Sequence, residues 1–200
     1  MRFLIVTLIL VGSVVPGFAT VDPDSDQIGI YFDTNADVTC IDVPPIVPFW
    51  AYVVITNPSS EILGVEFSLC IEYIGGYESM LFLLSDEWWL GPRIQPVELD
   101  WCPGGVIMGW GTPLLPQEAN AVVVGLQYMM LSNMGLQFYL GPVSSPSIED
   151  GLPAYLGSGN VVLSLGVSSG DPGLPVASVN GCNAVTVEGT TFGRMKCLFR

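Results

Sequence analysis

The sequence contains no histidine, and this absence removes much of the chemistry that enzymes use. Imidazole is the commonest general base and a frequent ligand of transition metals. A serine or cysteine nucleophile would have to be activated by Lys196 or by a carboxylate, and neither stands in a recognisable catalytic motif. Zinc is disfavoured as well, because Cys102 has no second cysteine at C-x-x-C spacing. We therefore expect a protein that is not an enzyme and holds no cofactor.

Basic residues are scarce. The 200 residues include only five lysines and arginines against nineteen aspartates and glutamates, which gives a formal charge of −14. Nucleic acids and anionic membranes are bound through basic surfaces, so we expect neither as a partner. The acidic balance is compatible with solubility and with Ca²⁺ binding, but it selects neither.

Long apolar runs are confined to the start of the chain. Arg2, the apolar residues 3–15 and the Gly-Phe-Ala sequence at residues 17–19 match the three parts of a signal peptide. The apolar run is too short to span a membrane and is interrupted by Pro16. We expect cleavage after residue 19 and export of a mature chain without a membrane span. The destination is the medium, the cell surface or the periplasm.

Runs with helical spacing are rare in the rest of the chain, whereas glycine and proline are abundant. The clearest pattern lies in residues 47–73. In its second half Val65, Phe67 and Leu69 alternate with polar residues, as on a strand with one apolar and one solvent-exposed face. Residues 57–60, Asn-Pro-Ser-Ser, have the composition of a turn. We predict an antiparallel hairpin over this region.

Other segments bounded by turn residues predict further strands. They are residues 27–33, 96–101, 105–110, 121–131, 135–140, 160–165 and 177–180. Eight or nine strands predict an all-β, two-sheet antiparallel sandwich, because a single open sheet would leave an apolar face uncovered. The expected organisation is a signal peptide (residues 1–19), one sandwich domain (residues 20–181) and a basic tail (residues 182–200).

Five cysteines in an exported chain predict two disulfides and one remaining thiol. Cys40 precedes the predicted hairpin and Cys70 points to its polar face, so we favour a Cys40–Cys70 bridge. A Cys182–Cys197 bridge would hold the tail, and Cys102 would then be unpaired. Alternatively, Cys197 is free and pairs between chains.

Acidic residues at the start of the mature chain form a weak calcium candidate. Asp22, Asp24 and Asp26, followed by Asp33, are spaced as four ligands of a calcium-binding loop. Gln27, however, occupies the position where such a loop needs glycine. The competing interpretation is a solvated N-terminal segment, and we expect no other metal site.

Aromatic and acidic residues gather in the middle of the chain. Trp88, Trp89 and Trp101 stand near Asp86 and Glu87, and flat rings beside carboxylates are the groups with which proteins bind sugars. The competing interpretation is that the rings fill the core. Neighbouring residues on a strand point to opposite faces, so Trp88 and Trp89 cannot both point inward.

The same region contains enough carboxylates for a glycoside hydrolase, which needs a pair of them. The candidates are Asp86, Glu87, Glu98 and Asp100. Because nineteen acids produce such pairs by chance, a hydrolase is only a remote alternative.

The C-terminal segment differs in charge from the rest of the chain. Arg194, Lys196 and Arg200 all fall in the last seven positions, and the apolar residues of 191–199 have helical spacing. We predict a short tail that could be helical. It is either held electrostatically on the acidic body or serves as an address or anchoring tag.

Several segments resemble a group of uncharacterised secreted bacterial proteins. They are residues 28–33, 51–58, 137–142 and 169–177. The most specific likeness is the ending, which is similar to a Trp-Gly-x-x-Lys-x-Leu-Tyr-Arg terminus. The matching residues are Phe192, Gly193, Lys196, Leu198, Phe199 and Arg200. Phenylalanine replaces both aromatic residues of that motif, and Cys197 departs from the pattern.

This resemblance implies export, a β-sandwich and no assigned activity, and it favours a tag in the tail. More distantly, the strand pattern resembles cohesin-like sandwiches of surface assemblies, so the expected fold is of jelly-roll or cohesin-like type. We interpret the chain as a structural, adhesive or surface-assembly protein. The alternative is a carbohydrate-binding module. The expected partner is a surface glycan or another secreted protein, and the oligomeric state is left open.

Overall fold

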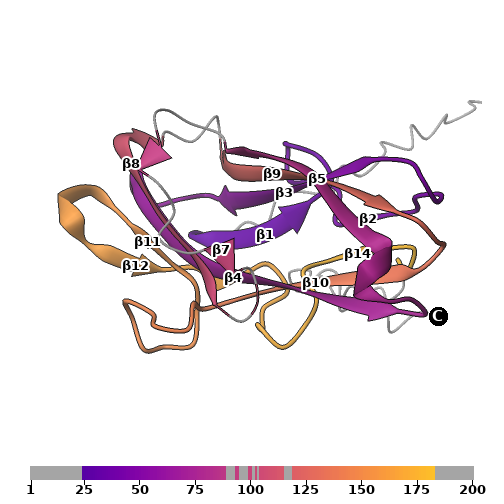
Figure 1. Ribbon diagram of the computed structural model, residues 1–200. Helices are drawn as coiled ribbons and strands as arrows, with labels where there is room; N and C mark the ends of the chain where they lie inside the picture. Colours follow the sequence, from indigo (N-terminus) through magenta and orange to yellow (C-terminus); the bar gives the residue numbers. More distant parts are fainter. Residues whose placement is uncertain are drawn as a thin grey trace, which may run out of the picture.

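The computed structural model describes residues 24–88, 93–94, 99–100, 102, 104–114 and 119–182. They form two β-sheets packed against each other, with two short 3₁₀ segments, η1 (Glu78–Met80) and η2 (Ser158–Asn160) (Figure 1). The predicted all-β sandwich is confirmed. None of the helical segments in this part of the chain is long and apolar enough to cross a membrane. The predicted signal peptide and the motif of the tail lie outside the described residues.

The first sheet has five strands in the order β13-β1-β3-β9-β5. Their bounds are β1 (Gln27–Tyr31), β3 (Phe49–Thr56), β5 (Leu81–Trp88), β9 (Asn120–Met130) and β13 (Gly166–Val167). Neighbours are antiparallel except β1 and β13, which pair in parallel.

The second sheet has nine strands, and its main path is β12-β11-β4-β10-β14-β2. Beside this path β8 pairs with β4, and the short β6 and β7 pair with β8. The bounds are β2 (Cys40–Ile41), β4 (Ile62–Ile74), β6 (Arg93–Ile94), β7 (Leu99–Asp100), β8 (Gly105–Leu114), β10 (Gly135–Gly141), β11 (Ala154–Leu156), β12 (Val162–Ser164) and β14 (Ala177–Val179). The pair β2–β14 is parallel, the second exception to the predicted antiparallel arrangement.

The core lies between the sheets and follows from alternation along each strand. Every second residue of β3, starting at Phe49, is buried in one cluster with the inward residues of β4, β9 and β10. Phe49 lies 5.9 Å from Tyr128 of its own sheet, and Tyr128 lies 6.0 Å from Phe138 of the other sheet, measured between ring centroids. These rings link the two layers. Burial raises the pKa of Tyr128.

The predicted hairpin over residues 47–73 is wrong in its pairing, although both strands exist. β3 belongs to the first sheet and β4 to the second, so the turn at residues 57–60 crosses between the layers. Asn57 has a positive φ of 46°, and Asp26 accepts a hydrogen bond from the Ser59 amide at 2.7 Å. Alternation predicts which side of a strand is buried, but it does not identify the strand's neighbour.

The outer face of β4 is less exposed than its polar residues predict. Glu66 is only 6 % exposed, because its carboxylate accepts hydrogen bonds from the amide and the hydroxyl of Ser147, both at 2.7 Å. These bonds hold the loop of residues 142–153 over the sheet. A buried carboxylate needs such partners, since burial without them is costly.

The disulfides differ from the predicted pairs. The structure joins Cys40 to Cys182 and Cys70 to Cys102, with Cα–Cα distances of 5.3 and 5.0 Å. In the second sheet β10 and β14 lie between β4 and β2, which places β2 about 14 Å from β4 at normal strand spacing. That distance is too long for a Cys40–Cys70 bridge. Because Cys182 is bound to Cys40, it is not available to Cys197, which lies outside the described residues.

Candidate functional site

Trp88 packs against the core. It lies opposite Val124 of β9, and its indole Nε1 donates a hydrogen bond to Asp86 Oδ2 at 2.6 Å. Asp86 lies opposite the buried Leu126, on the same side of β5. Trp88 and Asp86 are therefore part of the packing at the edge of the sandwich, as the competing interpretation proposed for the tryptophans.

Glu87 points to the other side of β5, where it lies opposite Gly125. Asp86 and Glu87 are thus on opposite faces of one strand and cannot act together on one bond. Trp89, Trp101 and Glu98 lie outside the described residues.

Two aromatic residues that the sequence reasoning did not select lie beside Glu87. Trp50 and Tyr52 are half-buried on the outer face of β3, with ring centroids 6.0 Å apart and ring planes inclined by 13°. A Cβ atom at Gly125 would lie 3.0 Å from the Tyr52 ring and 3.4 Å from the Trp50 ring. The glycine therefore lets the Tyr52 ring lie closely against β9, whereas the Trp50 ring would be in ordinary contact with a Cβ atom there. Burial and, to a smaller degree, the nearby charge of Glu87 raise the pKa of Tyr52.

Polar residues extend this surface along the same face. Gln127 of β9 lies opposite Trp50 and accepts a hydrogen bond from the Ser85 hydroxyl at 3.3 Å. We call the surface formed by Trp50, Tyr52, Glu87, Gly125 and Gln127 the aromatic face. It combines ring surface, one carboxylate and one amide. These groups can bind a partner, but they include no nucleophile and base in contact.

Exposed apolar side chains gather where β4 and β9 end and where β3 and β5 begin. Eight of the eleven large apolar residues that are exposed in the described part of the chain lie in these segments. We call them the apolar end: Ile46, Val47, Ile74, Tyr77, Phe82, Leu83, Leu84 and Leu131. Phe82 lies opposite Met129 on the outer side of the first sheet, so the apolar end continues into the aromatic face.

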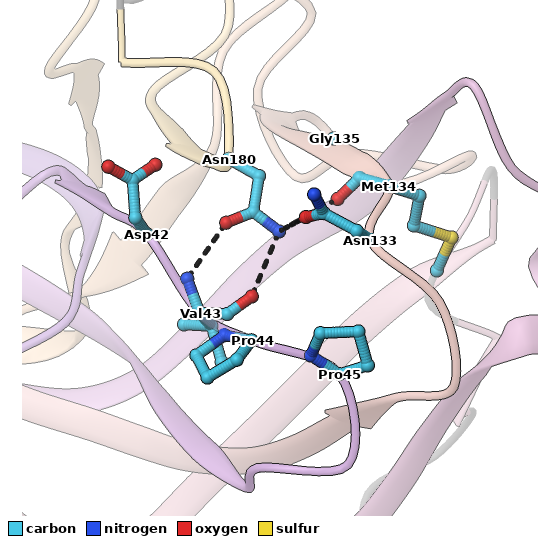
Figure 2. Close-up of a pocket in the computed structure, with 8 residues that line it drawn as sticks. All are labelled: Asp42, Val43, Pro44, Pro45, Asn133, Met134, Gly135 and Asn180. Carbon is cyan, nitrogen blue, oxygen red and sulfur yellow. Dashed lines mark hydrogen bonds between the residues drawn. The ribbon is translucent and has the colours of Figure 1, made fainter.

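A groove of about 480 Å³ opens beside the apolar end (Figure 2). Its walls are the loop of residues 42–45 and the turn of residues 133–135, and Asn180 lies between them. The Asn180 Oδ1 accepts a hydrogen bond from the Val43 amide at 2.8 Å. Its Nδ2 donates to the Val43 carbonyl, to Asn133 Oδ1 and to the Met134 carbonyl at 3.1–3.2 Å. Asn180 is thus occupied in holding the walls, while Asp42 and the two prolines line the groove.

The weak calcium candidate does not assemble in the described residues. Asp26 Oδ1 accepts hydrogen bonds from the Ser59 amide and the Tyr155 hydroxyl, both at 2.7 Å, and so supports the turn between the sheets. Asp22 lies outside the described residues. Among the described residues no group of three or more cysteine, aspartate or glutamate side chains is arranged to hold a metal ion.

The comparisons with known proteins show the fold. No family model matches the chain, and no curated protein matches it. Among solved structures it is similar to the sixth cohesin from the scaffoldin B of Acetivibrio cellulolyticus, solved in complex with a mutant Cel5 dockerin. The identity is 12 %, the TM-score is 0.50, and the match covers 78 % of this chain and 99 % of that one.

It is also similar to the seventh ScaB type I cohesin from Pseudobacteroides cellulosolvens, with 13 % identity and a TM-score of 0.48 over 82 % of this chain and 94 % of that one. The first of these likenesses supports the cohesin-like sandwich that the strand pattern predicts.

Proposed function

We propose that this chain is an exported, non-catalytic module that binds another protein through the apolar end. The main support is the gathering of eight exposed apolar side chains there. Soluble monomers rarely expose large contiguous apolar surface, and such patches commonly mark sites of association. The adjacent groove adds polar groups from Asp42 and Asn133, which can fix the orientation of a partner.

Two further observations support an assembly role. A solved sandwich of this fold was crystallised with a protein partner, a dockerin. The two disulfides suit an oxidising compartment outside the cytoplasm, where a secreted partner would be met.

Site-specific photocrosslinking tests this proposal. A photoreactive phenylalanine analogue is placed at Tyr77, which is 72 % exposed in the apolar end, in cells that make the protein. The matched control places it at Val161, which is 54 % exposed outside the apolar end. We expect one discrete product at Tyr77, identified by mass spectrometry, and none at Val161.

The product at Tyr77 is expected to fall at least about threefold when Leu83 and Leu84 are both changed to serine, because two apolar contacts are removed. Equal products at Tyr77 and Val161, or a product unaffected by the serine changes, would contradict binding through the apolar end.

A further inference from the structure

The aromatic face has an exposed acidic group beside two half-buried rings, and no cation among the described side chains neutralises it. Glu87 is exposed and lies next to Tyr52, where it affects the ionisation of the phenol. Arg93 is the only lysine or arginine in the described part of the chain, and the whole chain has a formal charge of −14. A cation that complements Glu87 can therefore be supplied from outside the described residues.

The ring geometry selects the kind of cation. Trp50 and Tyr52 are inclined by only 13°, so they present two nearly parallel rings rather than an edge-to-face pair. A planar guanidinium stacks on such rings and forms two hydrogen bonds with a carboxylate, whereas an ammonium acts as a point charge. The groove beside the apolar end also has a carboxylate, Asp42, but no aromatic ring lines it, so it lacks a surface on which a guanidinium could stack.

We propose that the aromatic face binds an arginine side chain of the partner protein, with the guanidinium on Trp50 and Tyr52 and its N–H groups directed to Glu87. This inference rests on the proposed function, since it names the chemistry by which the same partner is recognised. The aromatic face continues directly from the apolar end, through Phe82 and Met129, so one partner can cover both. Gly125 is a positioning residue, because a Cβ atom there would lie 3.0 Å from the Tyr52 ring, closer than ordinary contact, and that ring would have to shift.

The test is an NMR titration of the full ¹⁵N-labelled chain with a defined probe, the peptide acetyl-Gly-Arg-Gly-amide. The neutral control replaces arginine with citrulline, which keeps the shape of the side chain without its charge. We expect saturable shifts of the Trp50 indole N–H and the Gly125 amide with the arginine peptide. The citrulline peptide is expected to bind at least about tenfold more weakly.

Variants show whether the named residues make the contact. Glu87→Gln and Trp50→Ala should each weaken binding of the arginine peptide by about two- to fivefold. This is the change in affinity expected from loss of one exposed ion pair or cation–π contact. Glu149→Gln, which removes an exposed acid in the loop of residues 142–153, should leave the affinity unchanged. If the Trp50→Ala variant folds poorly, Trp50→Phe replaces it in the titration, because it keeps an aromatic ring at this position.

Three results would overturn the inference. They are equal binding of the citrulline peptide, shifts produced by neutral oligosaccharides but not by arginine, and no shifts with any probe. The second result would make the aromatic face a sugar site instead. None of them depends on crosslinking at Tyr77, so loss of the arginine site and loss of the apolar docking site give different outcomes.

Discussion

At the scale of single residues, the neighbours of Tyr139 on the sheet surface change the pKa of its hydroxyl. It lies on the outer side of β10, where its hydroxyl is 2.8 Å from Glu72 Oε2 and 2.9 Å from Gln137 Oε1. Burial, together with the hydrogen bond to Glu72, raises the pKa of Tyr139 to about 12. The neutral phenol can donate a hydrogen bond to the carboxylate, whereas the phenolate would repel it.

This shift predicts a loss of stability in alkaline solution. A native pKa above the unfolded value of about 10 means that the stabilising contribution of Tyr139 is complete below pH 10. The contribution is then lost as the pH rises from about 10 through about 12. Subtracting the absorbance titration of Tyr139→Phe from that of the wild type at 295 nm should isolate one tyrosine that ionises near pH 12. A difference curve centred near pH 10 would contradict the shift.

At the scale of elements, the sequence predicts strands better than it predicts their neighbours. Predicted segments match β1, β3, β4, β7, β8, β9, β10, β12 and β14, because alternation and turn residues are local signals. The sequence does not predict the short strands β2, β6, β11 and β13, since a run of two or three residues has no period. It also misses the eight-residue β5, in which an apolar run is followed by acidic residues without regular alternation. The crossing of residues 57–60 between sheets was missed for a different reason, because a turn within a sheet and one between sheets use the same residues.

The candidate site was predicted only in part, and for a related reason. Glu87 was selected and does lie on an open face, whereas Trp88 is used in packing. Trp50 and Tyr52 stand in a strand that is apolar throughout, so their positions suggested burial. Their outward side follows only from the register between β3 and β9, in which Tyr52 lies opposite Gly125. Because β3 and β9 are far apart in the sequence, their pairing, and with it the aromatic face, could not be predicted from local patterns.

The connections between elements near the groove depend on Asn180. It follows β14, has a positive φ of 53°, and makes four hydrogen bonds to the loop and turn that form the groove walls.

We expect Asn180→Ala to lower the free energy of unfolding by about 2–4 kcal/mol, because buried partners lose their bonds and alanine disfavours positive φ. Asn180→Gly should recover roughly 1 kcal/mol of that loss, since glycine adopts this conformation without strain. Urea denaturation of the three proteins measures both differences, and an alanine variant as stable as the wild type would show that the groove walls do not depend on Asn180.

At the scale of the whole molecule, the two disulfides constrain very different lengths of chain. The Cys40–Cys182 bridge joins β2 to the segment after β14, across a sequence separation of 142 residues. The Cys70–Cys102 bridge joins β4 to the segment before β8, across a separation of 32 residues. The first bridge therefore encloses nearly all of both sheets. The second acts within one sheet, next to the strands that pair with β8.

This difference predicts an order of stabilities. If the bridges act mainly by restricting the unfolded chain, loop closure contributes about 5 kcal/mol for Cys40–Cys182 and about 4 kcal/mol for Cys70–Cys102. We expect the Cys40→Ser/Cys182→Ser variant to be less stable than the Cys70→Ser/Cys102→Ser variant. Together the two contributions amount to about 9 kcal/mol, so removal of both bridges should unfold the protein if its total stability lies in the lower part of the usual range of about 5–15 kcal/mol. Urea denaturation of the two double variants and of the reduced wild type measures this order. The reverse order would mean that local packing around Cys70, rather than the length of the closed loop, determines what each bridge contributes.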